Sequence, residues 1–92
     1  MNDEFTFSQS IIAHLENDYS SFDKMKVIQL LDEVKPEHVM AGSEYNLLNT
    51  RYSILYLAKG DVAEVAQLVE CAKIDFRDVI YWATMEKEAT EK

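Results

Sequence analysis

The residues best suited to chemistry are two histidines and one cysteine: His14, His38 and Cys71. A structural zinc site needs about four such ligands, and a helix presents two of them on one face at i, i+4 spacing. His14 and Asp18 have that spacing, but a single pair of this kind arises easily by chance. The sequence therefore predicts no metal site. It predicts histidines at the surface or core edge and a small buried thiol at Cys71.

No other pattern marks a catalytic site. Two isolated glycines cannot form a phosphate-binding loop, and one cysteine excludes an internal disulfide framework. No nucleophile, base and acid stand out as a triad. A small enzyme stays open as an alternative, with a site built from Tyr52, Tyr56, Arg51 or His14. The sequence itself predicts no catalytic residue and no cofactor.

Composition favours a helical fold. The chain has 92 residues, of which 48% are hydrophobic, with 2 glycines and 1 proline. One domain is expected at this length, and so few turn-forming residues argue against an all-β protein. We predict an all-α fold: a compact four- to five-helix bundle formed as a single domain by residues 1–92. Residues 1–6 and 88–92 are expected to fray.

The charge of the chain is strongly acidic. Nine Lys and Arg oppose seventeen Asp and Glu, which gives −8. Phosphate backbones repel such a surface, so no nucleic-acid partner is expected, whereas a basic partner is possible. The N-terminus lacks a basic region followed by an apolar run, and no apolar stretch approaches the ~18 residues of a membrane span. The simplest inference is a cytoplasmic protein with no membrane contact.

Capping residues divide the chain into helices. The first is expected at 9–18 with Ser8 as N-cap, and the second runs from Ser20 or Ser21 to the residues before Pro36. The apolar residues of the second helix cover a wide arc, which predicts substantial burial. A long helix over 43–59, capped by Ser43, has two apolar faces and is expected at the centre of the bundle.

Two further helices follow this central one. Gly60 suits the left-handed position after the long helix, and Asp61 with Glu64 has capping-box spacing. A fourth helix is expected after Asp61. Asp75 is expected to cap a fifth, which runs from about residue 76 to 87.

The fifth helix carries more apolar residues than one face can hold. With Phe76 at 0°, its core face lies at about 300° to 40°, whereas Tyr81, Met85 and Trp82 lie at about 140°, 180° and 240°. Exposed aromatic residues and methionine are typical of contact surfaces. We therefore predict a partner-binding site at Tyr81, Trp82 and Met85. The simplest partner is a second copy of the chain. Two alternatives stay open: another helix of the chain covers Tyr81 and Met85, and Trp82 extends the core.

The stretch EVAQLVECAKIDFRDVIYWA, residues 64–83, has a helix–turn–helix-like layout. A recognition helix must offer donors to bases and phosphates. Here the second helix carries more acids than bases, namely Asp75, Asp78, Glu86 and Glu88 against Arg77 and Lys87. We interpret the layout as a packing corner, with a helix–turn–helix-like nucleic-acid-binding protein as the alternative function.

The segment AKIDFRDVIYWA resembles the C-terminal segment of short, uncharacterised bacterial helical proteins. The resemblance covers about residues 60–83 and rests on the order acid, aromatic, Arg, Asp, aliphatic. It implies an all-helical fold in a bacterial cytoplasm and carries no activity. Taken together, the sequence predicts a non-catalytic protein that acts through protein–protein contact, as a homodimer, adaptor or inhibitor.

Overall fold

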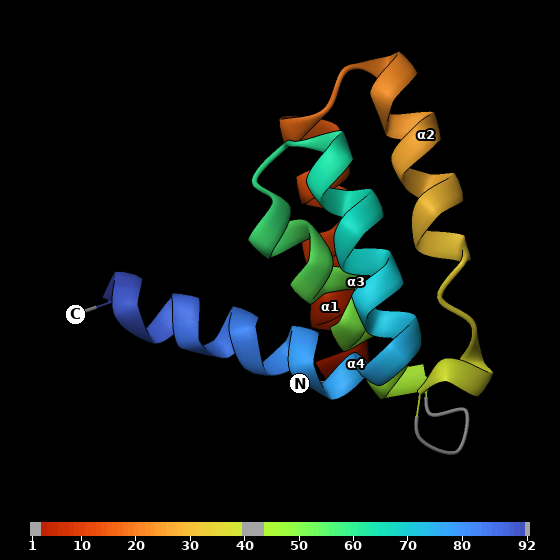
Figure 1. Ribbon diagram of the computed structural model, residues 1–92. Coiled ribbons are helices and arrows are strands. Elements are labelled where there is room, and N and C mark those ends of the chain that lie inside the picture. The colour runs from red at the N-terminus through yellow and green to blue at the C-terminus, as the bar shows by residue number, and fades with distance from the viewer. Residues whose placement is uncertain (1–2, 40–43, 92) are drawn as a thin grey trace.

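Four α-helices and one short 3₁₀ turn make up the described chain (Figure 1). The computed structural model describes residues 3–39 and 44–91 and, within these, the side chains of residues 8–39 and 44–90. No strand occurs in these two ranges. The predicted all-α bundle is confirmed. The elements are α1 (Asp3–Asp18), α2 (Ser21–Asp32), η1 (Pro36–His38), α3 (Glu44–Ala58) and α4 (Val62–Glu91).

The central helix is α3, as predicted. It is flanked by α1 and α4, whereas α2 packs mainly on α4 (Figure 1). Leu55 and Ile54 are fully buried on neighbouring positions of α3, so both of its apolar faces contact other helices. Two polar side chains of α3, Thr50 and Ser53, are buried there as well. Thr50 Oγ1 donates to the carbonyl oxygen of Asn46 at 2.7 Å, which satisfies the hydroxyl without a partner from another helix.

The first helix begins earlier than predicted. Helix α1 starts at Asp3, so Ser8 lies inside the helix and is not its N-cap. No glycine or proline interrupts residues 3–8, and acidic residues at the start of a helix are favoured by its dipole. The predicted cap Ser43 lies outside the described residues. The predicted fraying of the two chain ends stays a prediction.

The second helix is less buried than predicted. Val27, Leu30 and Leu31 pack into the core, but Phe22 and Met25 are 84% and 66% exposed. The cause is the position of α1, which packs on α3 and barely touches α2. The cap prediction for this helix is correct, because Ser20 Oγ accepts a hydrogen bond from the amide of Asp23 at 3.2 Å.

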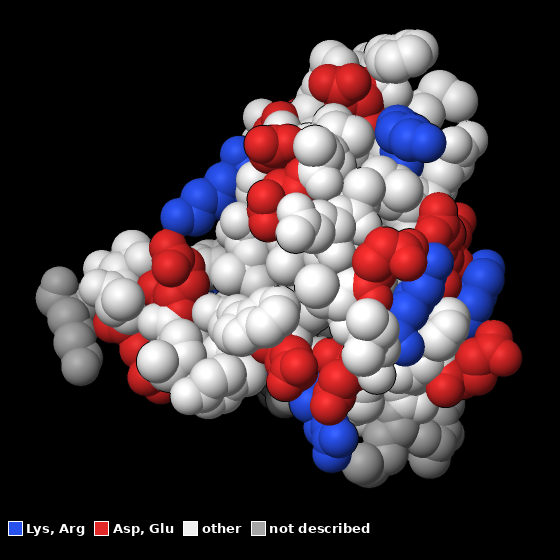
Figure 2. Space-filling model, viewed as in Figure 1, with Lys and Arg blue, Asp and Glu red and all other residues white. Residues whose placement is uncertain are grey.

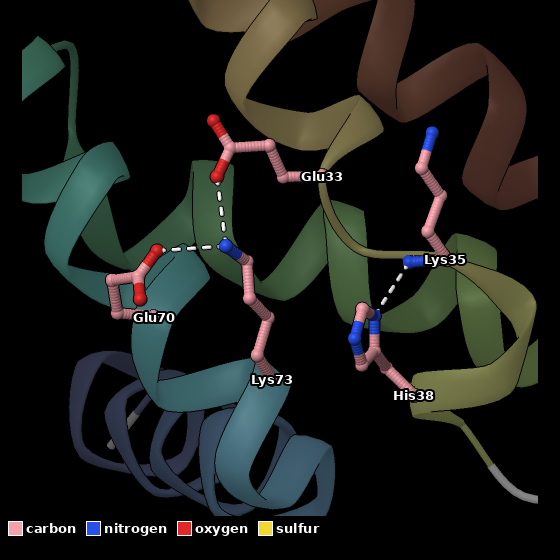
Figure 3. A network of polar contacts seen from close by, with 5 residues as sticks. All are labelled: Glu33, Lys35, His38, Glu70 and Lys73. Atoms are coloured by element: carbon pink, nitrogen blue, oxygen red, sulfur yellow. Dashed lines mark hydrogen bonds and ion pairs between the residues drawn. The ribbon is translucent and has the colours of Figure 1, made fainter.

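Two polar contacts fix the segment after α2 (Figure 3). Lys73 Nζ on α4 lies 2.8 Å from Glu33 Oε1 at the end of α2 and 2.9 Å from Glu70 Oε2. The amide of Lys35 donates to Nδ1 of His38 at 2.9 Å, across the η1 turn. His38 therefore satisfies a backbone donor at the core edge, which agrees with its predicted structural role.

The turn between α3 and α4 follows the predicted capping. Gly60 has φ +88°, and a Cβ there would lie 3.2 Å from the carbonyl oxygen of Asp18. Both facts favour glycine at this position. Asp61 Oδ1 then accepts hydrogen bonds from the amides of Ala63 at 3.0 Å and Glu64 at 3.2 Å. Asp61 is thus the N-cap of α4.

Candidate protein-contact site

Asp75 divides α4 into two helices that run in different directions (Figure 1). Its backbone is extended, with φ −154° and ψ 101°. Its Oδ1 accepts from the Arg77 amide and from Arg77 Nε, each at 3.0 Å. The predicted N-cap is confirmed by this geometry. Hydrogen bonds from the Arg77 side chain, and then from its amide, hold the pKa of Asp75 below its ordinary value.

We call residues 76–91 the arm. Its inner face is buried, with Val79 fully enclosed and Ala83 3% exposed. Its last turns extend beyond the other helices, at the left of Figure 1. Because the arm is a helix that packs by one face, its opposite face has no neighbouring helix among the described residues.

The three predicted contact residues lie on this outer face. Tyr81, Trp82 and Met85 are 61%, 43% and 50% exposed. Their spacing places them within an arc of about 100° on one side of the helix. We call these three residues the arm face. Their exposure rules out a fully buried position for Tyr81 and Met85.

The charge around the arm face is acidic. At 100° per residue, Asp78 and Glu88 fall in or beside the same arc, and both are exposed. The two basic side chains of the arm are engaged elsewhere. Arg77 pairs with Asp75, and Lys87 lies over tyrosine rings. In Figure 2 acidic side chains accompany the uncharged surface of the arm. Both basic side chains of the arm are thus engaged within the chain, next to exposed acidic residues.

A polar and aromatic cluster lies behind the arm. Lys87 Nζ is 4.4 Å from the ring centre of Tyr52 and 5.4 Å from that of Tyr56. The ring of His14 is 5.9 Å from that of Tyr52, and its Nδ1 is 2.9 Å from Asp18 Oδ2. Three of the four residues considered for an enzyme site thus lie together.

Arg51, the fourth of these residues, points elsewhere: its Nη2 donates to the carbonyl oxygen of Val34 at 3.0 Å.

The cluster borders a cavity of about 350 Å³. It is lined by His14, Asp18, Tyr56, Lys59, Glu86 and Thr90. Lys59 Nζ lies 2.8 Å from Glu86 Oε1, and this hydrogen bond raises the pKa of Lys59. Among the described residues that line the cavity there is no serine or cysteine, and the charged groups there pair with one another. We therefore interpret the cluster as a structural contact that holds the arm against α1 and α3, because its side chains come from all three helices.

The described part of the chain offers no other marked chemistry. Within it, no group of three or more His, Cys, Asp and Glu side chains could hold a metal ion. Cys71 is half-buried against the core, so it is less enclosed than predicted. Among the described helices, none is long and apolar enough to cross a membrane.

A second apolar surface lies between α1 and α2 and was missed in the sequence. It is a groove of about 270 Å³ whose apolar lining consists of Ile11, Ile12, Leu15, Ile28, Leu31 and Leu48. A signal was present, because Phe22, Met25 and Ile28 recur every three residues, beside the core positions of the same helix. The wide apolar arc of α2 was interpreted as burial, although a half-exposed helix has the same pattern.

No protein-family model, curated protein or solved structure matches the chain.

Proposed function

We propose that the protein is a non-catalytic protein-binding domain whose contact face is the arm face of Tyr81, Trp82 and Met85. The observation that carries this proposal is the exposure of three large apolar side chains together on a projecting helix. Aromatic residues and methionine are enriched in protein interfaces, where their burial contributes most of the binding free energy. The cytoplasmic location and the bacterial origin expected from the sequence stay predictions.

A wider surface supports the same proposal. A stable interface buries about 1,200 Å² or more in total, which three side chains cannot supply. A hollow of about 490 Å³ adjoins Tyr81 between the arm and α3. Its lining consists of Asn46, Asn49, Phe76, Arg77, Ile80, Tyr81 and Thr84. A partner that covers the arm face and enters this hollow has both apolar area and amide groups to contact.

The charges favour a basic partner over a second copy. A two-fold contact places one patch against the same patch. Asp78 and Glu88 of both copies would then share one interface, and like charges there are unfavourable. A foreign protein with an apolar residue flanked by Lys or Arg avoids this repulsion. Self-association, if it occurs, should therefore strengthen as salt screens the acids.

Light scattering separates the two partners. The wild type at high micromolar concentration is expected to be a monomer at low salt, with any dimer favoured by added salt. A stable dimer at low salt would establish the homodimer instead, provided that the Tyr81→Glu and Met85→Glu double variant no longer forms it. Circular dichroism checks that the double variant stays helical. If it unfolds, the two side chains are needed for the stability of the fold and the arm face is not a contact surface.

Affinity capture with mass spectrometry from the native host then tests the contact itself. Proteins held by the wild type should be lost with the double variant and kept with Ile74→Glu. Ile74 is the matched control because it is 88% exposed and lies outside the arm. Capture that is equal for all three proteins would overturn the arm face as the contact site.

A further inference from the structure

The groove between α1 and α2 is shaped by a hairpin whose helices diverge. At the closed end, Lys24 Nζ on α2 lies 2.9 Å from Glu16 Oε1 on α1. Away from this pair the two helices hardly touch, and α3 forms the floor with Leu48. The groove is apolar along its length and ends at Ser8, Asp32 and Arg51.

Large apolar side chains remain exposed along this groove and its α2 rim. Ile12 is 52% exposed and Ile28 41%, and both line the groove. Met25, one turn before Ile28, is 66% exposed. Removal of such side chains from water on binding a partner is favourable through the hydrophobic effect. Exposed apolar side chains that lie close together on a surface, unlike singly scattered ones, are typical of binding sites.

A helix is the secondary structure that fits this groove. Ser8 and Leu15 mark its extent on α1, which is about 10 Å, or two helical turns. The walls are helices, and their backbone N–H and C=O groups are already paired within each helix. A strand laid here would leave its own backbone groups without partners, whereas a helix satisfies them internally. An added helix would pack on α1 and α2 with residues spaced i, i+3, i+4 and i+7.

The rim of the groove selects a basic helix. At the closed end the side chain of Glu16 is 60% exposed, whereas that of its partner Lys24 is 29% exposed. At the open end the side chain of Asp32 is 62% exposed, whereas that of Arg51 is 22% exposed. Arg51 Nη2 lies 3.9 Å from Asp32 Oδ1 and donates to the Val34 carbonyl, so the more accessible charge is negative.

From these contacts we infer that the groove binds an amphipathic helix of another protein, with an apolar face seated on Ile12 and Ile28 and a Lys or Arg beside Asp32. This surface is separate from the arm face, which gives the protein two sites for partners. The occupant is defined by its chemistry: a helix that places about two turns in the groove, apolar along one side and cationic along its flanks.

The test uses a fluorescein-labelled peptide of about 15 residues, built from leucine and lysine with leucines at i, i+3, i+4 and i+7. Fluorescence anisotropy at physiological salt measures its dissociation constant for the full chain. Two matched peptides serve as controls. One has the same composition with the leucines spread around the helix, and the other has glutamate in place of lysine. Both are expected to bind at least about tenfold more weakly.

Three variants locate the site. Ile12→Asn with Met25→Gln makes the groove polar without a charge change and should weaken binding about tenfold or more. Asp32→Asn should weaken it about threefold. Met85→Gln alters the arm face and should leave binding unchanged. Circular dichroism verifies the fold of each variant. Chemical-shift mapping on the wild type gives a second readout, because the methyl signals of Ile12 and Ile28 should move while that of Ile74 should not.

Several results would overturn the inference. Equal binding of the spread-leucine peptide, or no loss in the groove variant, would mean non-specific attraction to an acidic protein. Loss in Met85→Gln alone would place the peptide on the arm face. A dimer in light scattering that the groove variant dissociates would make a second copy the occupant. Absence of binding and of methyl shifts at about 1 mM peptide would leave the groove without this function.

Discussion

The ammonium group of Lys87 lies 4.4 Å from the centre of the Tyr52 ring, across the junction of the arm with α3. About two turns further along the chain, directly after the end of α3, Lys59 Nζ lies 2.8 Å from Glu86 Oε1 of the arm. The last turns of the arm are thus held by polar and cation–π contacts, whereas its first turns are held by buried Phe76 and Val79. This division implies that the two ends of the arm differ in stability.

Substitution of Lys87 by methionine should loosen only the end of the arm. Methionine keeps an unbranched apolar chain near Tyr52 but removes the charge, and a cation–π contact at an exposed site contributes about 0.5 to 1 kcal/mol. Amide hydrogen exchange should accelerate over residues 84–90 and stay unchanged in α3. Lys26→Met, at an exposed position on α2, is the control. Unchanged exchange in the arm would mean that apolar contacts alone hold it.

Leu55→Ala should strongly destabilise the bundle. Leu55 is fully buried at the centre of α3, so the substitution removes apolar contacts and leaves a cavity that costs about 2 to 5 kcal/mol. Urea unfolding measures the change in the free energy of unfolding. Ile74→Ala, at a position that is 88% exposed, should change it by less than about 0.5 kcal/mol. A loss below about 1 kcal/mol at Leu55 would contradict the central position of α3.

Helix boundaries were predictable where a local signal marks them. Ser20, Asp61 and Asp75 each accept a hydrogen bond from an amide two or three residues ahead, so their side-chain chemistry alone indicated a helix start. Ser8 carried the same signal and was misleading, because nothing before it interrupts the helix from Asp3. A cap residue is therefore informative mainly where a break in the chain accompanies it.

Surfaces were predictable only in part. The outward direction of Tyr81 and Met85 followed from helical periodicity once the core face of the arm was identified. The exposure of Met25 could not be predicted, because the sequence pattern of a helix is the same whether or not another helix covers its apolar residues. The cluster of His14, Tyr52 and Lys87 joins residues far apart in the chain, and single-sequence spacing holds no information on such contacts.

The cap at Asp75 gives a prediction about the stability of the corner where the arm begins. Asp75→Ala removes acceptors for the Arg77 amide and side chain and should lower the melting temperature by about 4 °C or more. Asp75→Asn keeps an oxygen that accepts the hydrogen bond from the Arg77 amide, so it should have a smaller effect. Because the pKa of Asp75 is lowered, its contribution is present above the ordinary aspartate pKa and is lost as pH falls through the lowered value. Equal damage by Asn and Ala would assign the effect to the ion pair and not to the cap.

The pairing of Lys73 with Glu33 gives a prediction about pH, since it ties α2 to α4 (Figure 3). Hydrogen bonds to Glu33 and then Glu70 raise the pKa of Lys73, and the bond from Lys73 lowers the pKa of Glu33. The contribution of Lys73 is present below about pH 10.4 and is lost as pH rises through its raised pKa. That of Glu33 is present above about pH 4.3 and is lost as pH falls through its lowered pKa.

The difference in urea midpoint between the wild type and Lys73→Met should therefore be largest near neutral pH and shrink at both extremes. Glu33 is exposed and Lys73 is only half-buried, so the difference should be small and should diminish in high salt. Glu33→Gln should remove part of the same stabilisation, and the Glu33→Gln and Lys73→Met double variant should lose less than the sum of the two single losses. Additive losses, or a difference that is constant from acidic to alkaline pH, would show that the pair does not stabilise the contact between α2 and α4.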